Sequence, residues 1–132
     1  MVTDMAIDLV TLVVEDRDDA LEFYVETLGF ELHQDESYGD ANRWIEIRPP
    51  GSTATITVKT PAMFDERERP HRRALIGTSP QLTFRVDDCQ ALYRRLRAAD
   101  VPLDGEPSNA PWGISLTARD PSGNPVVFTE AV

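Results

Sequence analysis

The chain has 132 residues, of which 41% are hydrophobic and 27% are charged, proportions typical of one soluble globular domain with a sizeable core. Its formal net charge is -10, whereas binding to nucleic acid or to an anionic membrane surface requires a basic surface. No apolar run is long enough to cross a bilayer, and the single cysteine, Cys89, excludes an internal disulfide, so we expect a cytoplasmic protein.

A strand, a helix and three short strands are predicted in the first part of the chain. The stretch VTLVVED, at 10–16, alternates like a strand and ends in paired acids, and Asp16 is placed to cap the following helix. Short strands are then predicted at 30–33, 44–48 and 55–59. The helix has apolar residues at helical spacing, namely Ala20, Leu21, Tyr24 and Leu28.

The segment 61–78 differs in composition from the elements on either side of it. It contains two prolines and a dense run of charge, DERERPHRR. Because prolines interrupt regular structure and charge runs are usually solvated, we expect a linker or mobile loop here.

The elements after residue 79 repeat the first set in the same order. A strand at 82–86 precedes a second pair of acids and a second helix, and further strands are predicted at 101–103, 112–116 and 126–130. The paired acids, the helix, the tryptophan that opens a strand and the Pro-x-Gly turn all recur in register. Four such matches indicate a duplication of one βαβββ unit.

The duplication predicts an α+β fold that forms a single domain, 1–132. Module one spans 5–60 and module two spans 79–132, and the charged linker 61–78 joins them. The two modules are expected in tandem, each with its helix on one face of its own sheet.

Alternation along the strands separates two faces of each predicted sheet. Leu82, Phe84 and Val86 suit packing beneath a helix, so the residues between them point to the opposite, open face. Such a face is commonly left for a cleft or an interface. Transferring this register across the repeat assigns to the open faces Leu9, Thr11, Val13, Glu46, Arg48, Thr55, Thr57, Lys59, Gln81, Thr83, Arg85, Ser115, Thr117, Val127 and Thr129.

Four stretches of the sequence together resemble one known group of proteins. VTLVVEDRDDALEFYVETLGFEL, LTFRVDDCQALYRRL, PWG and DPSGNPVVF resemble the vicinal oxygen chelate superfamily, which includes glyoxalase I, extradiol dioxygenases and bleomycin resistance proteins. The resemblance covers nearly the whole chain except 61–78, and it implies curved mixed sheets around a cleft. It does not specify an activity, because the superfamily includes several chemistries and non-enzymes.

The resemblance also implies where a metal ion would bind. Metal-dependent members carry a His or Gln early in the first strand of each module and usually a Glu in each last strand, positions that fall here on Leu9, Thr55 or Thr57, Gln81 and Val127. Leucine and valine have no lone pair to donate, and threonine hydroxyls are weak ligands, so only Gln81 remains. We therefore expect no metal and no other cofactor, and we assign no catalytic residue.

Our interpretation is a metal-free protein that binds a small organic molecule, aromatic or carbonyl-bearing, in its cleft. Arg85 is expected to anchor the ligand, and Trp112 either lines the cleft or closes the end of its module's core. A homodimer is also expected, because relatives are commonly two-fold dimers and association would cover a sheet edge. The predicted ligand-binding residues are Leu9, Glu46, Arg48, Thr57, Gln81, Thr83, Arg85, Trp112 and Val127.

Two other interpretations stay open at this point, and with them the question whether the protein is an enzyme. One is a divalent-metal-dependent, glyoxalase-like lyase or dioxygenase with substitute ligands such as His33 or Glu46. The other is a non-catalytic dimeric regulatory module.

Three further residues are given structural roles. Cys89 opens the second helix but has no histidine near it in sequence, so we expect a small buried hydrophobic residue rather than a reactive thiol. Glu46 is expected to pair with Arg48 or Arg85, and Trp44 is expected to close the end of its module's core.

Overall fold

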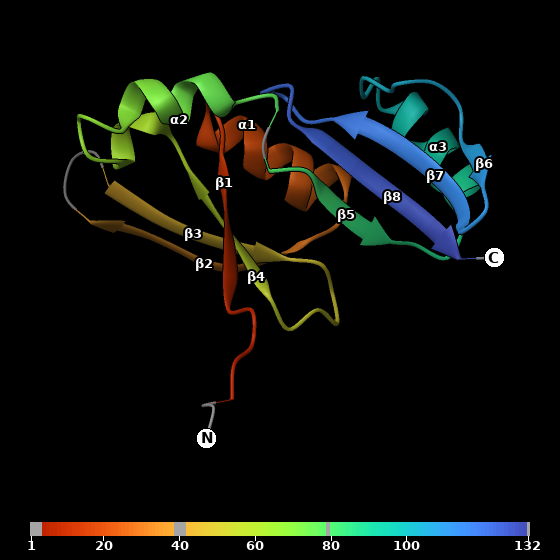
Figure 1. Ribbon diagram of the computed structural model, residues 1–132, viewed down its shortest axis with the longest axis horizontal. Coiled ribbons are helices and arrows are strands. Elements are labelled where there is room, and N and C mark those ends of the chain that lie inside the picture. The colour runs from red at the N-terminus through yellow and green to blue at the C-terminus, as the bar shows by residue number, and fades with distance from the viewer. Residues whose placement is uncertain (1–3, 39–41, 79, 132) are drawn as a thin grey trace. The chain divides into compact units, whose positions relative to one another are not determined.

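The computed structural model describes residues 4–38, 42–78 and 80–131, which form two compact units divided between residues 74 and 75 (Figure 1). Each unit contains one four-stranded mixed sheet with at least one helix. The predicted α+β fold with two βαβββ modules in tandem is therefore confirmed. No helix within the described ranges is both long enough and apolar enough to cross a membrane.

The first unit has the strand order β1-β4-β3-β2. β1 and β4 run parallel, whereas β3 is antiparallel to both of its neighbours. Helix α1 packs against β4, and Asp16 caps it by accepting a 2.9 Å hydrogen bond from the backbone N–H of Asp19. The elements are β1 (Leu9–Val13), α1 (Arg17–Leu21), the π-helical segment η1 (Glu22–Thr27), β2 (Glu31–Tyr38), β3 (Asn42–Arg48) and β4 (Thr55–Lys59).

The second unit repeats this topology, with the strand order β5-β8-β7-β6. Its first and last strands again run parallel, and Asp88 caps its helix by accepting a 3.0 Å hydrogen bond from the N–H of Ala91. This helix, α3, packs against β7 and β8 (Figure 1). The elements are β5 (Leu82–Arg85), α3 (Cys89–Ala98), β6 (Ser108–Ala110), β7 (Gly113–Arg119) and β8 (Pro125–Ala131).

Burial alternates along β3 as expected, but not along β4, where Thr55, Ile56, Thr57 and Val58 are all buried. In β3, Ile45 and Ile47 are fully buried, whereas the residues that alternate with them, Trp44, Glu46 and Arg48, are only partly buried. Burying each isoleucine contributes about 1.5–3 kcal/mol to folding, so a one-residue slip of this strand would be strongly unfavourable. In the second unit, Leu116, Ala118, Val126 and Phe128 form the corresponding buried set.

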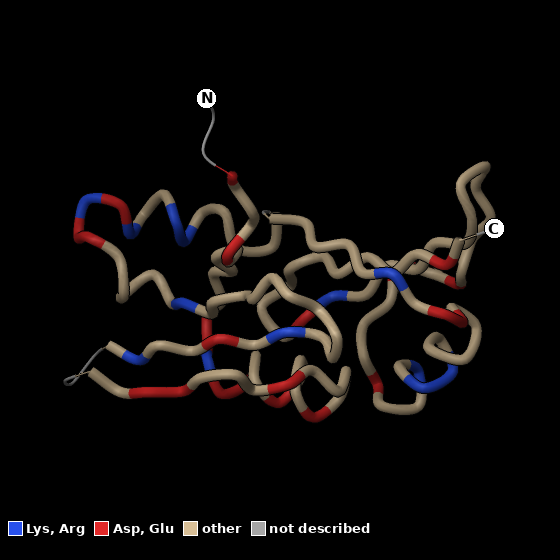
Figure 2. The backbone as a smooth tube through the Cα atoms, turned by 90° about the horizontal axis from the view of Figure 1, so that it is seen from below, with Lys and Arg blue, Asp and Glu red and all other residues tan. Residues whose placement is uncertain are grey.

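The segment 61–78, within which the boundary between the two units falls, contains regular structure instead of the mobile loop that its composition suggested. It contains a 3-10 turn, η2 (Pro61–Met63), and a helix, α2 (Arg69–Leu75). Pro61 is the first residue of its turn and Pro70 is the second residue of α2, positions whose N–H groups would have no partner within the helix. The Arg69 side chain ties the two together by donating to the carbonyls of Phe64 and Ala62. Figure 2 shows how basic and acidic residues intersperse along this segment.

The prediction of a strand at 101–103 is wrong. Val101 uses its N–H to close the end of α3 on the carbonyl of Leu96, and Pro102 has no N–H to donate. Only Leu103 forms an isolated bridge, with Ala118, and the edge strand of this sheet is instead β6.

Candidate functional site

The turn before β8 determines which way the side chains of that strand point. Asp120 and Asn124 are both buried, and the Asp120 carboxylate accepts hydrogen bonds from the N–H groups of Ser122 and Asn124, each 2.9 Å long. The Asn124 side chain donates to Asp120 over 3.1 Å and accepts from the N–H of Gly77 over 2.7 Å. This rigid turn sends Val126 inward, and by alternation Val127 lies on the open face.

The strand register resolves which threonine of β4 corresponds to Val127. Thr57 lies beside Thr11 of the parallel strand β1. Val127 lies beside Thr83 of the parallel strand β5. Because Thr11 and Thr83 occupy equivalent positions in the repeat, Thr57 rather than Thr55 is the counterpart of Val127.

These positions do not fit a divalent metal ion. Leu9 and Val127 offer hydrocarbon only, Thr57 offers a neutral hydroxyl, and Gln81 is the one remaining polar side chain. Within the described residues, no three His, Cys, Asp or Glu side chains gather in a way that could hold an ion. His33 is exposed on β2.

Glu46 is held by neighbours other than those the sequence suggested. One carboxylate oxygen accepts from the indole N–H of Trp44 over 2.7 Å, and the other accepts from the hydroxyl of Thr55 over 3.1 Å. Arg48 does not pair with it, because its Nε lies 3.7 Å from a carboxylate oxygen of Glu31 on the adjacent strand. The expected pairing of Glu46 with Arg48 is therefore wrong, and the carboxylate is fixed in orientation by two hydrogen-bond donors.

Thr57, directly across from Glu46 on the neighbouring strand, is 1% exposed. Its hydroxyl has no hydrogen-bond partner among the described residues. Burying an unpaired hydroxyl is unfavourable by about 1–3 kcal/mol. This unpaired group lies two residues from Lys59 on the same strand.

Two aromatic rings and two cations lie beside this face. The Lys59 ammonium is 5.3 Å from the ring centre of Trp44 and 5.2 Å from that of Phe64, and the Arg72 guanidinium is 4.4 Å from the ring of Phe64. Trp44 therefore lies on the open face and does not close the end of the core, because it alternates with the buried Ile45. Phe64 and Arg72 were not among the predicted site residues because they belong to the presumed linker. A single aromatic residue in a charged segment is nevertheless a sign that the segment packs against the domain.

The open face of the second unit is more exposed. Gln81, Thr83 and Arg85 are exposed, and the side chain of Arg85 makes no hydrogen bond or ion pair within the part of the chain that the structure describes. Trp112 is 68% exposed, so it does not plug the core of its module. The next residue, Gly113, has a φ of 142°, and a Cβ there would clash with the carbonyl oxygen of Glu130.

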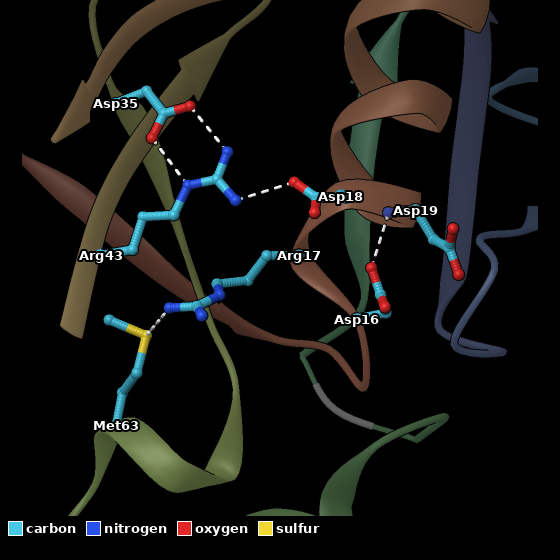
Figure 3. A network of polar contacts seen from close by, with 7 residues as sticks. All are labelled: Asp16, Arg17, Asp18, Asp19, Asp35, Arg43 and Met63. Atoms are coloured by element: carbon cyan, nitrogen blue, oxygen red, sulfur yellow. Dashed lines mark hydrogen bonds and ion pairs between the residues drawn. The ribbon is translucent and has the colours of Figure 1, made fainter. Parts of the chain in front are cut away.

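A polar network joins α1 to the β2–β3 hairpin (Figure 3). Arg43 donates from Nε and Nη2 to the two carboxylate oxygens of Asp35, both over 2.8 Å, and from Nη1 to Asp18 over 2.7 Å. The hydrogen bonds from Arg43 lower the pKa of the Asp35 carboxyl below its ordinary value. Arg17 lies beside this group and contacts the sulfur of Met63 at 3.5 Å.

Cys89 is fully buried at the start of α3, as expected for a structural residue. Burial raises the pKa of its thiol, with further contributions from the charges of Glu130 and Asp88. A thiol whose pKa is raised is a weak nucleophile at neutral pH, so the structure does not favour a reactive cysteine.

Several known proteins are similar to this chain in fold and in sequence. UcmS2, of known crystal structure, is 31% identical, with a TM-score of 0.83 over 96% of this chain and 98% of its own. TnmS3, an antibiotic binding protein from Streptomyces sp. CB03234, is 30% identical, with a TM-score of 0.79 over 100% of both chains. The uncharacterized protein YurT of Bacillus subtilis (strain 168) is 31% identical over 91% of this chain and 94% of its own. Since the sequence model of the family also matches residues 6–128, the chain belongs to the Glyoxalase/Bleomycin resistance protein/Dioxygenase superfamily.

Proposed function

We propose that this protein binds a small organic molecule, aromatic or carbonyl-bearing, on the open face of a sheet and without a metal ion. The observation that carries the proposal is the buried hydroxyl of Thr57, which has no partner among the described residues. Because the hydroxyl is buried, a ligand reaches it only where neighbouring side chains move aside. A ligand that then hydrogen-bonds to it would remove the unfavourable free energy of leaving it unpaired. Trp44, whose ring centre lies 5.3 Å from the Lys59 ammonium, supplies the aromatic surface that a flat ligand requires.

One relative supports binding rather than catalysis. TnmS3, which aligns over the full length of both chains, is described as an antibiotic binding protein. Binding by this chain needs no catalytic group, only apolar walls and a few placed polar atoms.

The metal-dependent alternative has less support from the side chains present. A lyase or dioxygenase with substitute ligands would need His33 or Glu46, but His33 is exposed on β2. Both oxygens of Glu46 already accept hydrogen bonds, from Trp44 and Thr55. Elemental analysis of the purified protein separates the two proposals, because one tightly bound transition metal per chain contradicts metal-free binding.

The test of binding uses a library of anionic, cationic and neutral aromatic compounds, screened by thermal shift in the presence of EDTA. Thr57→Val replaces the hydroxyl with a methyl group of similar size. It is expected to stabilise the free protein by up to about 1 kcal/mol and to weaken the hits by about fivefold. Thr55→Val is the matched control for stability, since its hydroxyl is already paired with Glu46 and its loss should destabilise the free protein. Hits that bind Thr57→Val with unchanged affinity would contradict the proposed site.

A further inference from the structure

We propose that Lys59 is the residue that holds the ligand's negative charge, and that the ligand is a planar aromatic anion. This inference rests on the proposed function and specifies the chemical class of the ligand. It assigns the recognition of the ligand's charge to module one, on the open face formed by β3 and β4, in place of Arg85.

The first argument is the state of the Lys59 ammonium. It lies against the rings of Trp44 and Phe64, at 5.3 and 5.2 Å from their centres, which fixes its position. It has three N–H donors, yet within the described ranges it makes no hydrogen bond and no ion pair. Aromatic faces attract a cation, but unlike a carboxylate they neither neutralise its charge nor accept strong hydrogen bonds from it. The ammonium can therefore still bind an anion.

The second argument is the charge around Phe64. Arg72 stacks on the same ring at 4.4 Å, and its Nε is buried with no hydrogen-bond partner among the described residues. Its one ion pair, with Glu68, has an N···O distance of 3.6 Å, longer than the 2.7–2.9 Å or so of a charge-assisted hydrogen bond. Two incompletely neutralised cations at one aromatic ring produce a positive potential, which would favour an anion.

The third argument is the polar and aromatic surface next to Lys59. Thr57 precedes it by two residues on the same face, so the buried hydroxyl lies about 7 Å along the strand from Lys59. The indole N–H of Trp44 is engaged by Glu46, so the ring cannot turn freely. A flat ligand with an anionic group at Lys59 and its ring beside Trp44 matches this arrangement. The net charge of -10 does not oppose it, because charges beyond a Debye length of about 8 Å are screened.

The sequence offers a direct probe, because Lys59 is its only lysine. Reductive methylation with ¹³C-formaldehyde keeps the positive charge and introduces one lysine NMR signal, while the labelled α-amino group serves as an internal reference. The probes are 2-naphthoate, its neutral analogue 2-naphthamide and the cation 2-naphthylmethylamine. We expect 2-naphthoate to shift the lysine signal saturably and to bind about tenfold more tightly than the amide.

Variants separate anchoring from a general effect of charge. Lys59→Gln should remove the preference for naphthoate over naphthamide, whereas Arg73→Gln, the same change of charge at an exposed position of α2, should retain it. Binding of naphthoate without movement of the lysine signal would overturn the assignment, as would equal binding of the acid and the amide, or no binding of either. Stabilisation by other library compounds in those cases would leave the proposed function standing.

Discussion

Asp120 and Asn124 form a closed pair at the base of β8: the Asp120 carboxylate accepts from both the backbone and the side-chain amide of Asn124, and both residues are buried. Asn124 also accepts from the N–H of Gly77, so its removal takes one donor from the buried Asp120 carboxylate and the acceptor from a partly buried N–H. Asn124→Ala should destabilise the protein by about 2–4 kcal/mol in urea unfolding. Asn109→Ala, at an exposed position of β6, should change stability by less than about 0.5 kcal/mol. Similar effects of the two variants would mean that the turn does not define β8.

The ion pair between Arg43 and Asp35 should make stability depend on pH. Arg43 lowers the pKa of Asp35, so the pair stabilises the fold above the ordinary carboxyl pKa of 3.8, and this stabilisation is lost as the pH falls through the lowered value. Because both side chains are partly exposed, Arg43→Met should cost no more than about 1 kcal/mol at neutral pH. The difference from the parent should diminish when unfolding is measured near pH 2. A difference that is constant across this range would indicate lost packing instead of lost charge.

Gly113 should tolerate no side chain. Its φ of 142° is unfavourable for any other residue, and an added Cβ meets the backbone of Glu130, which cannot move without breaking the β7–β8 ladder. Gly113→Ala is expected to lower stability by more than about 2 kcal/mol. Gly51, with a φ of 82° and nothing within 4 Å of its added Cβ, is the control. Gly51→Ala should cost only about 1 kcal/mol, measured by the same thermal unfolding.

Arg85 and Trp112 are predicted to contact the ligand. Since both side chains are exposed, Arg85→Ala and Trp112→Ala should leave the melting temperature of the free protein nearly unchanged. Their effect should instead be weaker binding of the aromatic hits, measured by isothermal titration calorimetry. If hits bind both variants as tightly as they bind the parent, these two residues do not belong to the site.

Association into a homodimer remains a prediction. β1 and β2 are the edge strands of the first sheet, as β5 and β6 are of the second, and unpaired edge groups favour pairing with another chain. Light scattering at micromolar concentration should give twice the chain mass of 14.8 kDa. A mass equal to that of one chain would contradict this expectation.

The order of elements and the family were determined by the sequence itself, because the signals involved are local. Alternation predicted that Ile45 and Ile47 would face the core, and Asp16 and Asp88 cap the helices as their positions suggested. The repeat of the pattern supplied the rest, since two copies of one unit must have the same strand order. The helices within 61–78 were not predicted, because their prolines were interpreted as interruptions of regular structure. These prolines occupy the first turns of helices, where proline is tolerated.

Only the tertiary structure decided the partners of the side chains on the open face. Glu46 had several candidate cations in the sequence, but β3 lies between β2 and β4, so Arg48 meets Glu31 while Glu46 meets Thr55. The position of the Lys59 ammonium near two rings likewise depends on Phe64, which comes after β4 and lies close to Lys59 only in the folded chain. Alternation fixes the face of a side chain but not its neighbour, because the neighbour comes from a strand or turn distant in sequence and brought close by packing.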